Sequence, residues 1–142
     1  MVIPISAWAL SQLLKVVIIL VREKRLDLWF LVRSGGMPSS HTALVCSLAT
    51  AVAMIEGVDS VTFAVAAILA MVVMYDAAGV RRSVSRQAVV LNRIVKEFWV
   101  KRPKGEIERN LREFIGHTPF QVVVGAFLGV AFTWVWIVAI SF

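Results

Sequence analysis

The sequence predicts an all-α integral membrane protein with about four transmembrane helices, and three observations carry this prediction. Hydrophobic residues make up 59% of the 142 residues, against about 45–50% in an ordinary globular domain. The mean hydropathy is +0.82, and the apolar residues gather in runs close to the ~20 residues that a membrane-spanning helix needs. Charged residues lie between these runs. We therefore interpret residues 1–142 as a single membrane domain.

Four apolar runs define the expected spans, which cover about residues 2–21, 42–57, 61–80 and 119–140. The first run is not expected to be a cleaved signal peptide, because Lys15 interrupts it and no small-x-small cleavage site follows. The single cysteine, Cys46, lies inside the second run and is expected to pack as a small apolar residue.

The basic residues set the expected orientation. Ten of the fifteen Lys and Arg residues lie in the loop 81–117 and four lie in segment 22–41. The turn between the second and third spans holds only Glu56 and Asp59. The positive-inside rule then places both basic loops in the cytoplasm and both termini on the opposite side. The net charge of +6 does not indicate nucleic-acid binding, because the basic residues flank apolar spans.

The long basic loop is expected to contain an amphipathic helix from Val84 to Trp99. Its apolar residues recur at helical spacing, with Arg and Lys residues between them. This pattern is typical of a helix that lies at the membrane interface. The segment 101–105, which contains Pro103, ends the helix, and a second short helix is expected over residues 106–114.

Both histidines stand in turns that open an apolar span. His41 belongs to Gly-Gly-Met-Pro-Ser-Ser-His-Thr, residues 35–42, and His117 to Gly-His-Thr-Pro, residues 116–119. Helix N-termini present N–H groups and partial positive charge, so they bind phosphate. Two such termini on one membrane face, each with an imidazole, indicate a phosphoryl site. The alternative is that both histidines are merely interfacial.

Hydroxyl residues at these turns are expected to cap the helices. Ser39 or Ser40 is placed to cap the second span, and Thr118 to cap the fourth, with Pro119 at its first position. Gln121 follows His117 by one helical turn, so its side-chain oxygen is placed to hold the imidazole ring.

Charged residues inside the apolar runs are the other candidates. Asp76 lies in apolar sequence, where an acid is costly and marks a functional site, with Arg81, Arg82, Lys15 or His117 as partners. The alternative is a structural ion pair. The two arginines are suited to clamp phosphate oxygens, or else they only anchor the loop in the cytoplasm. Lys15, on one helical face with Gln12, either binds phosphate or snorkels to the interface.

Three motifs carry a resemblance to a known family. Pro-Ser-Ser-His, residues 38–41, resembles the Pro-Ser-Gly-His motif of the type 2 phosphatidic acid phosphatase superfamily. Together with Tyr-Asp-Ala-Ala-Gly-Val-Arg-Arg, residues 75–82, and Gly-His-Thr-Pro-Phe-Gln-Val, residues 116–122, it is similar to the small divergent branch of that superfamily. This branch is also described as acid phosphatase/vanadium haloperoxidase-related.

The resemblance implies a phosphatase in which His41 protonates the leaving group and His117 attacks phosphorus. It implies no cofactor, and no motif indicates Mg²⁺. Gln121 stands where the superfamily has an orienting Asp, so Asp76 is expected to compensate by contacting His117 or by fixing the arginines. The motif glycine is replaced by Ser40. The expected phosphate-binding residues are Arg81, Arg82, Lys15, Ser39, Ser40 and Arg33.

Three functions stay open at this point. A cytoplasm-facing lipid phosphate phosphatase would act on a phosphate made in the inner leaflet, such as phosphatidylglycerophosphate, which it would convert to phosphatidylglycerol. A prenyl pyrophosphate phosphatase is the second reading. A non-catalytic lipid- or anion-binding membrane protein is the third, favoured by the neutral Gln121. The expected partners are the membrane and a lipid phosphate, and homo-oligomerisation is left open.

Overall fold

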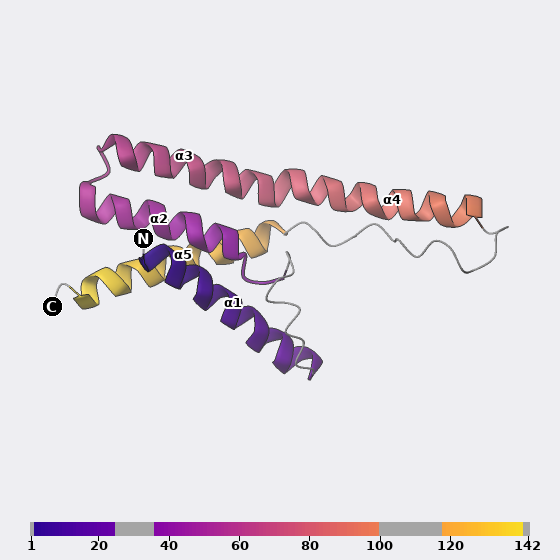
Figure 1. Ribbon diagram of the computed structural model, residues 1–142, viewed down its shortest axis with the longest axis horizontal. Helices are drawn as coiled ribbons and strands as arrows, with labels where there is room; N and C mark the ends of the chain where they lie inside the picture. Colours follow the sequence, from indigo (N-terminus) through magenta and orange to yellow (C-terminus); the bar gives the residue numbers. More distant parts are fainter. Residues whose placement is uncertain (1, 25–35, 100–117, 141–142) are drawn as a thin grey trace.

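The computed structural model describes residues 2–24, 36–99 and 118–140, and these residues are almost entirely helical, with no strand among them. Figure 1 shows how the helices are arranged. In chain order they are α1 (Val2–Glu23), α2 (Ser40–Glu56), α3 (Val61–Tyr75), the π-helix η2 (Asp76–Val80), α4 (Arg81–Trp99) and α5 (Pro119–Ile140).

Three stretches are long and apolar enough to cross a membrane, namely Val2–Val21, Val61–Val80 and Pro119–Ile140. The fourth apolar helix, α2, has 17 residues. At ~1.5 Å per residue it extends about 25 Å, less than the ~30 Å of a hydrocarbon core. The described residues thus contain three candidate spans and one shorter helix, and the prediction of four full spans is confirmed only in part.

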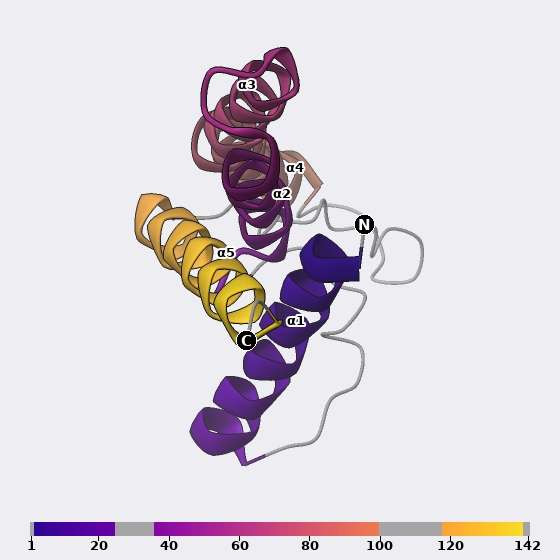
Figure 2. The ribbon, with the colours of Figure 1, turned by 90° about the vertical axis from the view of Figure 1, so that its left-hand side faces the viewer.

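The short helix α2 forms the centre of the bundle. It packs against α1, α3 and α5, and Figure 2 shows it lying between α3 on one side and α1 and α5 on the other. Its buried side chains are small: Ser40, Thr42, Ala43, Val45, Cys46, Ser47 and Ala51. The expected burial of Cys46 is confirmed. Small side chains let three neighbouring helices approach closely, as is typical of membrane bundles.

The closest approach is between α2 and α5. A Cβ atom on Gly125 would lie 2.5 Å from the Ser39 carbonyl oxygen, and one on Gly129 would strike the Ala43 carbonyl oxygen. One turn further along, the hydroxyls of Thr133 and Ser47 share a hydrogen bond of 2.6 Å. The Gly-x-x-x-Gly spacing of α5 therefore holds the two helices together, with a buried hydroxyl pair as the next contact.

The amphipathic helix expected from Val84 to Trp99 is confirmed, and α4 begins three residues earlier, at Arg81. Its direction differs from the expectation. Figure 1 shows α3, η2 and α4 as one nearly straight rod, so that α4 points away from the bundle and does not turn across its end. The segment from Tyr75 to Trp99 contains no proline, and the helix passes through η2 without a turn. The predicted helix at 106–114 lies outside the described residues.

The ends of the helices fall into two groups. The chain termini, the end of α2 and the start of α3 lie at one end of the bundle (Figures 1 and 2). The end of α1, the starts of α2 and α5, and η2 lie at the other. This arrangement brings the first turns of α2 and α5 to the same end, and the predicted sidedness of the basic loops stays a prediction.

Candidate functional site

Lys15 points into the bundle and not toward its surface. Only 2% of its surface is exposed, and it is the largest of the fully buried side chains. Its Nζ donates a hydrogen bond of 2.9 Å to the side-chain oxygen of Gln12, one turn earlier on α1. The expected pairing of these two residues is present. The burial argues against snorkelling, because a snorkelling lysine would keep its ammonium group in water.

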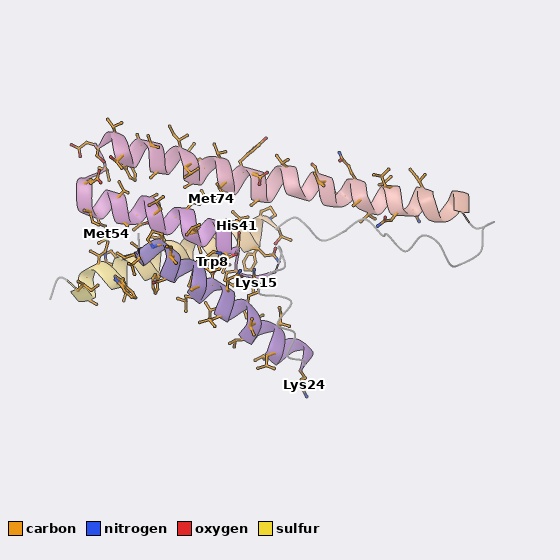
Figure 3. All side chains as sticks on the ribbon, in the orientation of Figure 1. Trp8, Lys15, Lys24, His41, Met54 and Met74 are labelled. Carbon is orange, nitrogen blue, oxygen red and sulfur yellow. The ribbon has the colours of Figure 1, made fainter. Side chains whose placement is uncertain are left out.

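The stem of Lys15 lies against the turn that opens α2. A Cβ atom on Gly36 would lie 3.4 Å from the Lys15 Cδ, an ordinary contact distance, and Gly36 itself has a φ of +89°. The turn therefore passes directly over the lysine stem in a backbone conformation that favours glycine. Figure 3 shows Lys15 and His41 at this same end of the molecule, with Lys24 far away at the tip of α1. Lys15 and the Pro-Ser-Ser-His segment thus converge in space.

The first turn of α2 has an unusual cap. Ser39 occupies the N-cap position, as expected, but its side chain makes no capping hydrogen bond to the backbone. Its hydroxyl oxygen instead accepts a hydrogen bond of 3.0 Å from the Thr42 hydroxyl. Ser39, Ser40 and Thr42 are buried, whereas His41 is exposed. Ser39 is thus the N-cap residue by position, its hydroxyl pairs with Thr42 and not with the backbone, and the imidazole of His41 faces outward.

The first turn of α5 is capped in the ordinary way. The Gln121 N–H donates to the Thr118 hydroxyl over 3.3 Å, and the Thr118 N–H donates to the Gln121 side-chain oxygen over 3.0 Å. This reciprocal arrangement is a capping box. It confirms Thr118 as the cap and Pro119 as the first helical residue. The oxygen expected to hold the His117 ring already serves this cap, and His117 itself lies outside the described residues.

The two turns are joined through their main chains. The Ser39 N–H donates a hydrogen bond of 3.2 Å to the Gln121 carbonyl oxygen, and Gly125 lies against the Ser39 carbonyl one turn further along α5. The Pro-Ser-Ser-His segment and the start of α5 therefore form one unit. Its position is set by backbone contacts, which few side-chain changes would alter.

The remaining candidates are Asp76 and three arginines. Asp76 is half-buried at the first residue of η2, and η2 also packs against α5. Arg81 and Arg82 form the first turn of α4, but their side chains lie outside the described part of the structure, as does all of Arg33. The expected contact of Asp76 with His117 or the arginines therefore stays a prediction.

Sequence reasoning overlooked two contributors. Thr42 follows His41 directly, and its hydroxyl donates to the Ser39 hydroxyl oxygen. The Gly125-x-x-x-Gly129 spacing was a visible signal for close helix packing. Among the described residues no group of three or more His, Cys, Asp or Glu side chains could hold a metal ion.

Comparison with known proteins agrees with the resemblance. A family model described as "Divergent PAP2 family" matches residues 1–132. The chain is also similar to the uncharacterized membrane protein YuiD of Bacillus subtilis (strain 168), with 41% identity over 139 residues that cover 91% of this chain and 87% of that protein. No solved structure matches the chain. This integral membrane chain belongs to the divergent PAP2 family.

Proposed function

We propose that the chain is a lipid phosphate phosphatase that works through a phosphohistidine. The observation that carries the proposal is the buried Lys15, whose stem lies under the Gly36 turn. A buried ammonium group needs an anionic partner, and among the described residues its hydrogen-bond partner is the neutral Gln12 amide. A phosphate at the start of α2 would supply that charge and meet the helix N-terminus.

The chemistry follows the superfamily resemblance. The imidazole of His117 attacks phosphorus, and the bond between phosphorus and the ester oxygen breaks. His41 gives its proton to the departing alcohol oxygen. Water then attacks the phosphohistidine and releases inorganic phosphate, which regenerates His117. The exposed position of His41 on the first turn of α2 suits contact with a leaving group.

The substrate that we propose is phosphatidylglycerophosphate, with phosphatidylglycerol as the product. If the basic loops are cytoplasmic, the site faces the inner leaflet, where this lipid is made and presents a terminal phosphate monoester. The loop 81–117, with ten basic and four acidic residues, would attract anionic lipid at about 1 kcal/mol per basic residue near the surface. A prenyl pyrophosphate recycled at the outer face would require the opposite orientation.

The proposal is tested with the full-length protein in lipid nanodiscs. Inorganic phosphate release is measured from phosphatidylglycerophosphate, from a prenyl pyrophosphate and from phosphatidic acid, with wild type and His117→Ala side by side. We expect release from phosphatidylglycerophosphate that His117→Ala abolishes. Release that persists in His117→Ala would contradict the phosphohistidine. Release only from the prenyl pyrophosphate would contradict the substrate.

One observation favours a second candidate, a non-catalytic lipid- or anion-binding protein. Gln121 stands in place of the orienting carboxylate, and its oxygen serves the capping box with Thr118. A neutral group there stabilises an imidazolium poorly. Saturable binding of phosphatidylglycerophosphate to the nanodisc protein without any phosphate release would support this candidate over the phosphatase.

A further inference from the structure

An apolar groove of about 630 Å³ runs along the outside of the bundle between the α3–η2 rod and α5. Its lining comes from Met71, Met74, Tyr75 and Ala78 on the rod, and from Pro119 and Val123 on α5, among others. The Tyr75 hydroxyl is the one polar side-chain group in this lining. The groove is therefore suited to hydrocarbon and unsuited to a water-soluble ligand.

One end of the groove adjoins the candidate site. Pro119, in the lining, directly follows the capping residue Thr118. Ala78 belongs to η2, two residues from Asp76. From Ala78 the groove continues along the rod to Met71, a distance of about 10 Å at ~1.5 Å per residue. The groove thus leads from the end of the bundle where α5 begins toward the middle of the apolar stretch Val61–Val80.

In a bilayer, hydrocarbon would cover this groove. Both walls belong to stretches long and apolar enough to cross a membrane, Val61–Val80 and Pro119–Ile140. In a bilayer the groove would be filled by an acyl or prenyl chain. Because bulk lipid is as apolar as the groove, apolar contact alone would not select one chain over another. Selection has to come from the headgroup held at the adjoining site.

We propose that the groove takes a hydrocarbon chain of the same lipid phosphate whose headgroup lies at the starts of α2 and α5. This inference rests on the proposed function and assigns the site a membrane-bound substrate that enters sideways from the leaflet. Met71 and Met74 give the walls flexible thioether side chains that adapt to different chain shapes. The Cys46 thiol donates to the Met74 sulfur over 3.8 Å, which ties this wall to α2.

The first test measures which lipid occupies the groove, and it does not depend on turnover. Val123 in the groove and Val65 on α3 outside it have nearly the same exposure, 64% and 63%. In a Cys46→Ala background, Val123→Cys and Val65→Cys are each labelled with bimane in phosphatidylcholine nanodiscs. The quenchers are phosphatidylglycerophosphate and phosphatidylcholine, both with brominated chains.

At position 123 the lipid phosphate should quench at about a tenfold lower mole fraction than phosphatidylcholine, the ratio expected when one charge-assisted hydrogen bond distinguishes the two headgroups. At position 65 the two lipids should quench equally. Equal quenching at position 123 would overturn the proposal, since the groove would then hold any bulk lipid.

A turnover measurement gives a second readout. Val123→Trp should lower kcat/KM on the long-chain lipid at least about fivefold, because a displaced chain misplaces the phosphate. Val65→Trp should leave it unchanged, and neither variant should affect a short-chain, water-soluble analogue. Normal turnover of the long-chain lipid by Val123→Trp would contradict the proposed role of the groove and leave the phosphatase proposal intact. Selective quenching without any phosphate release would contradict the phosphatase and support the groove as a binding site.

Discussion

Lys15 is the residue that connects the sequence motifs to a three-dimensional site. The Pro-Ser-Ser-His motif lies more than twenty positions away in the chain, and no periodicity links the two. The contact between the Lys15 stem and Gly36 brings them together. An ammonium group buried in an apolar bundle is costly unless a partner compensates it. This cost supports the proposal that an anion binds beside Lys15.

The first prediction concerns this ammonium group. Lys15→Met keeps the length of the side chain and removes its charge, so the KM for a lipid phosphate should rise about ten- to a hundredfold through the loss of a charge-assisted hydrogen bond. Lys24→Met removes an exposed lysine at the end of α1 and should leave the KM unchanged. Kinetics in nanodiscs of fixed lipid composition measure both. Similar KM values for the two variants would place Lys15 outside the phosphate site.

His41 provides a test of the proton transfer. If it protonates the departing oxygen, His41→Ala should lower turnover of a lipid with an alcohol leaving group by ~10²–10⁴-fold. An aryl phosphate, whose leaving group hardly needs a proton, should lose much less. Both rates are measured on the same preparation, so that folding defects cancel. Equal losses on the two substrates would assign His41 to phosphate binding.

Removal of metal ions tests whether phosphate release at the proposed site needs one. The superfamily resemblance implies that basic residues hold the phosphate and that no metal is required, so dialysis against EDTA should leave phosphate release unchanged. Release that falls on chelation and returns with added Mg²⁺ would contradict the metal-free proposal.

Among the contacts between helices, the contact of α2 with α5 matters most for the site. The described residues of the two turns are joined by a main-chain hydrogen bond from the Ser39 N–H to the Gln121 carbonyl oxygen. The spacing behind that bond is fixed by glycines that allow the backbones to touch. Any residue that pushes the helices apart should therefore disturb both turns together.

Gly129→Ala tests this spacing. The new Cβ would strike the Ala43 carbonyl oxygen, whereas a Cβ on Gly79 would meet nothing within 4 Å. Gly129→Ala should destabilise the protein by about 1–3 kcal/mol through overpacking. The control, Gly79→Ala, should be neutral or stabilising by ~0.5–1 kcal/mol, because alanine favours a helix over glycine. Unfolding in SDS–detergent mixtures compares them, and equal stability of both variants would argue against the close contact.

The helices were predictable from sequence to different degrees, for physical reasons. The third and fourth spans begin where expected, at Val61 and Pro119, because hydropathy changes sharply there. The junction of η2 and α4 was misjudged. At Arg81 the polarity changes while the helix continues, so polarity marks where the chain leaves the apolar region and not where the helix ends. The contact of the Lys15 stem with Gly36 and the hydrogen bond from Ser39 to the Gln121 carbonyl could not be foreseen, since each joins segments distant in sequence.

The molecule as a whole is polarised along the bundle. Both chain termini lie at one end, and the turns that open α2 and α5 lie at the other (Figure 1). The groove between the α3–η2 rod and α5 begins at the latter end. The proposed headgroup site and the apolar groove meet at one end of the bundle, and together they would match the two parts of a lipid lying in a single leaflet.

The leaflet that the site faces depends on the orientation of the chain in the membrane, which the accessibility of introduced cysteines measures. Because basic residues are retained in the cytoplasm, a cysteine at Ser83 on α4 should be protected in intact cells, and one at Val58 between α2 and α3 should be accessible. Both positions are exposed in the structure. In a Cys46→Ala background, Ser83→Cys and Val58→Cys are treated with a membrane-impermeant maleimide, before and after the cells are permeabilised.

Labelling of Val58→Cys in intact cells, with Ser83→Cys labelled only after permeabilisation, would place the starts of α2 and α5 at the inner leaflet. The phosphate site would then meet lipids made on the cytoplasmic side, as phosphatidylglycerophosphate requires. The reverse pattern would put the site at the outer face. It would exclude an inner-leaflet substrate while leaving the phosphatase chemistry intact, and prenyl pyrophosphates would become the substrates to assay first.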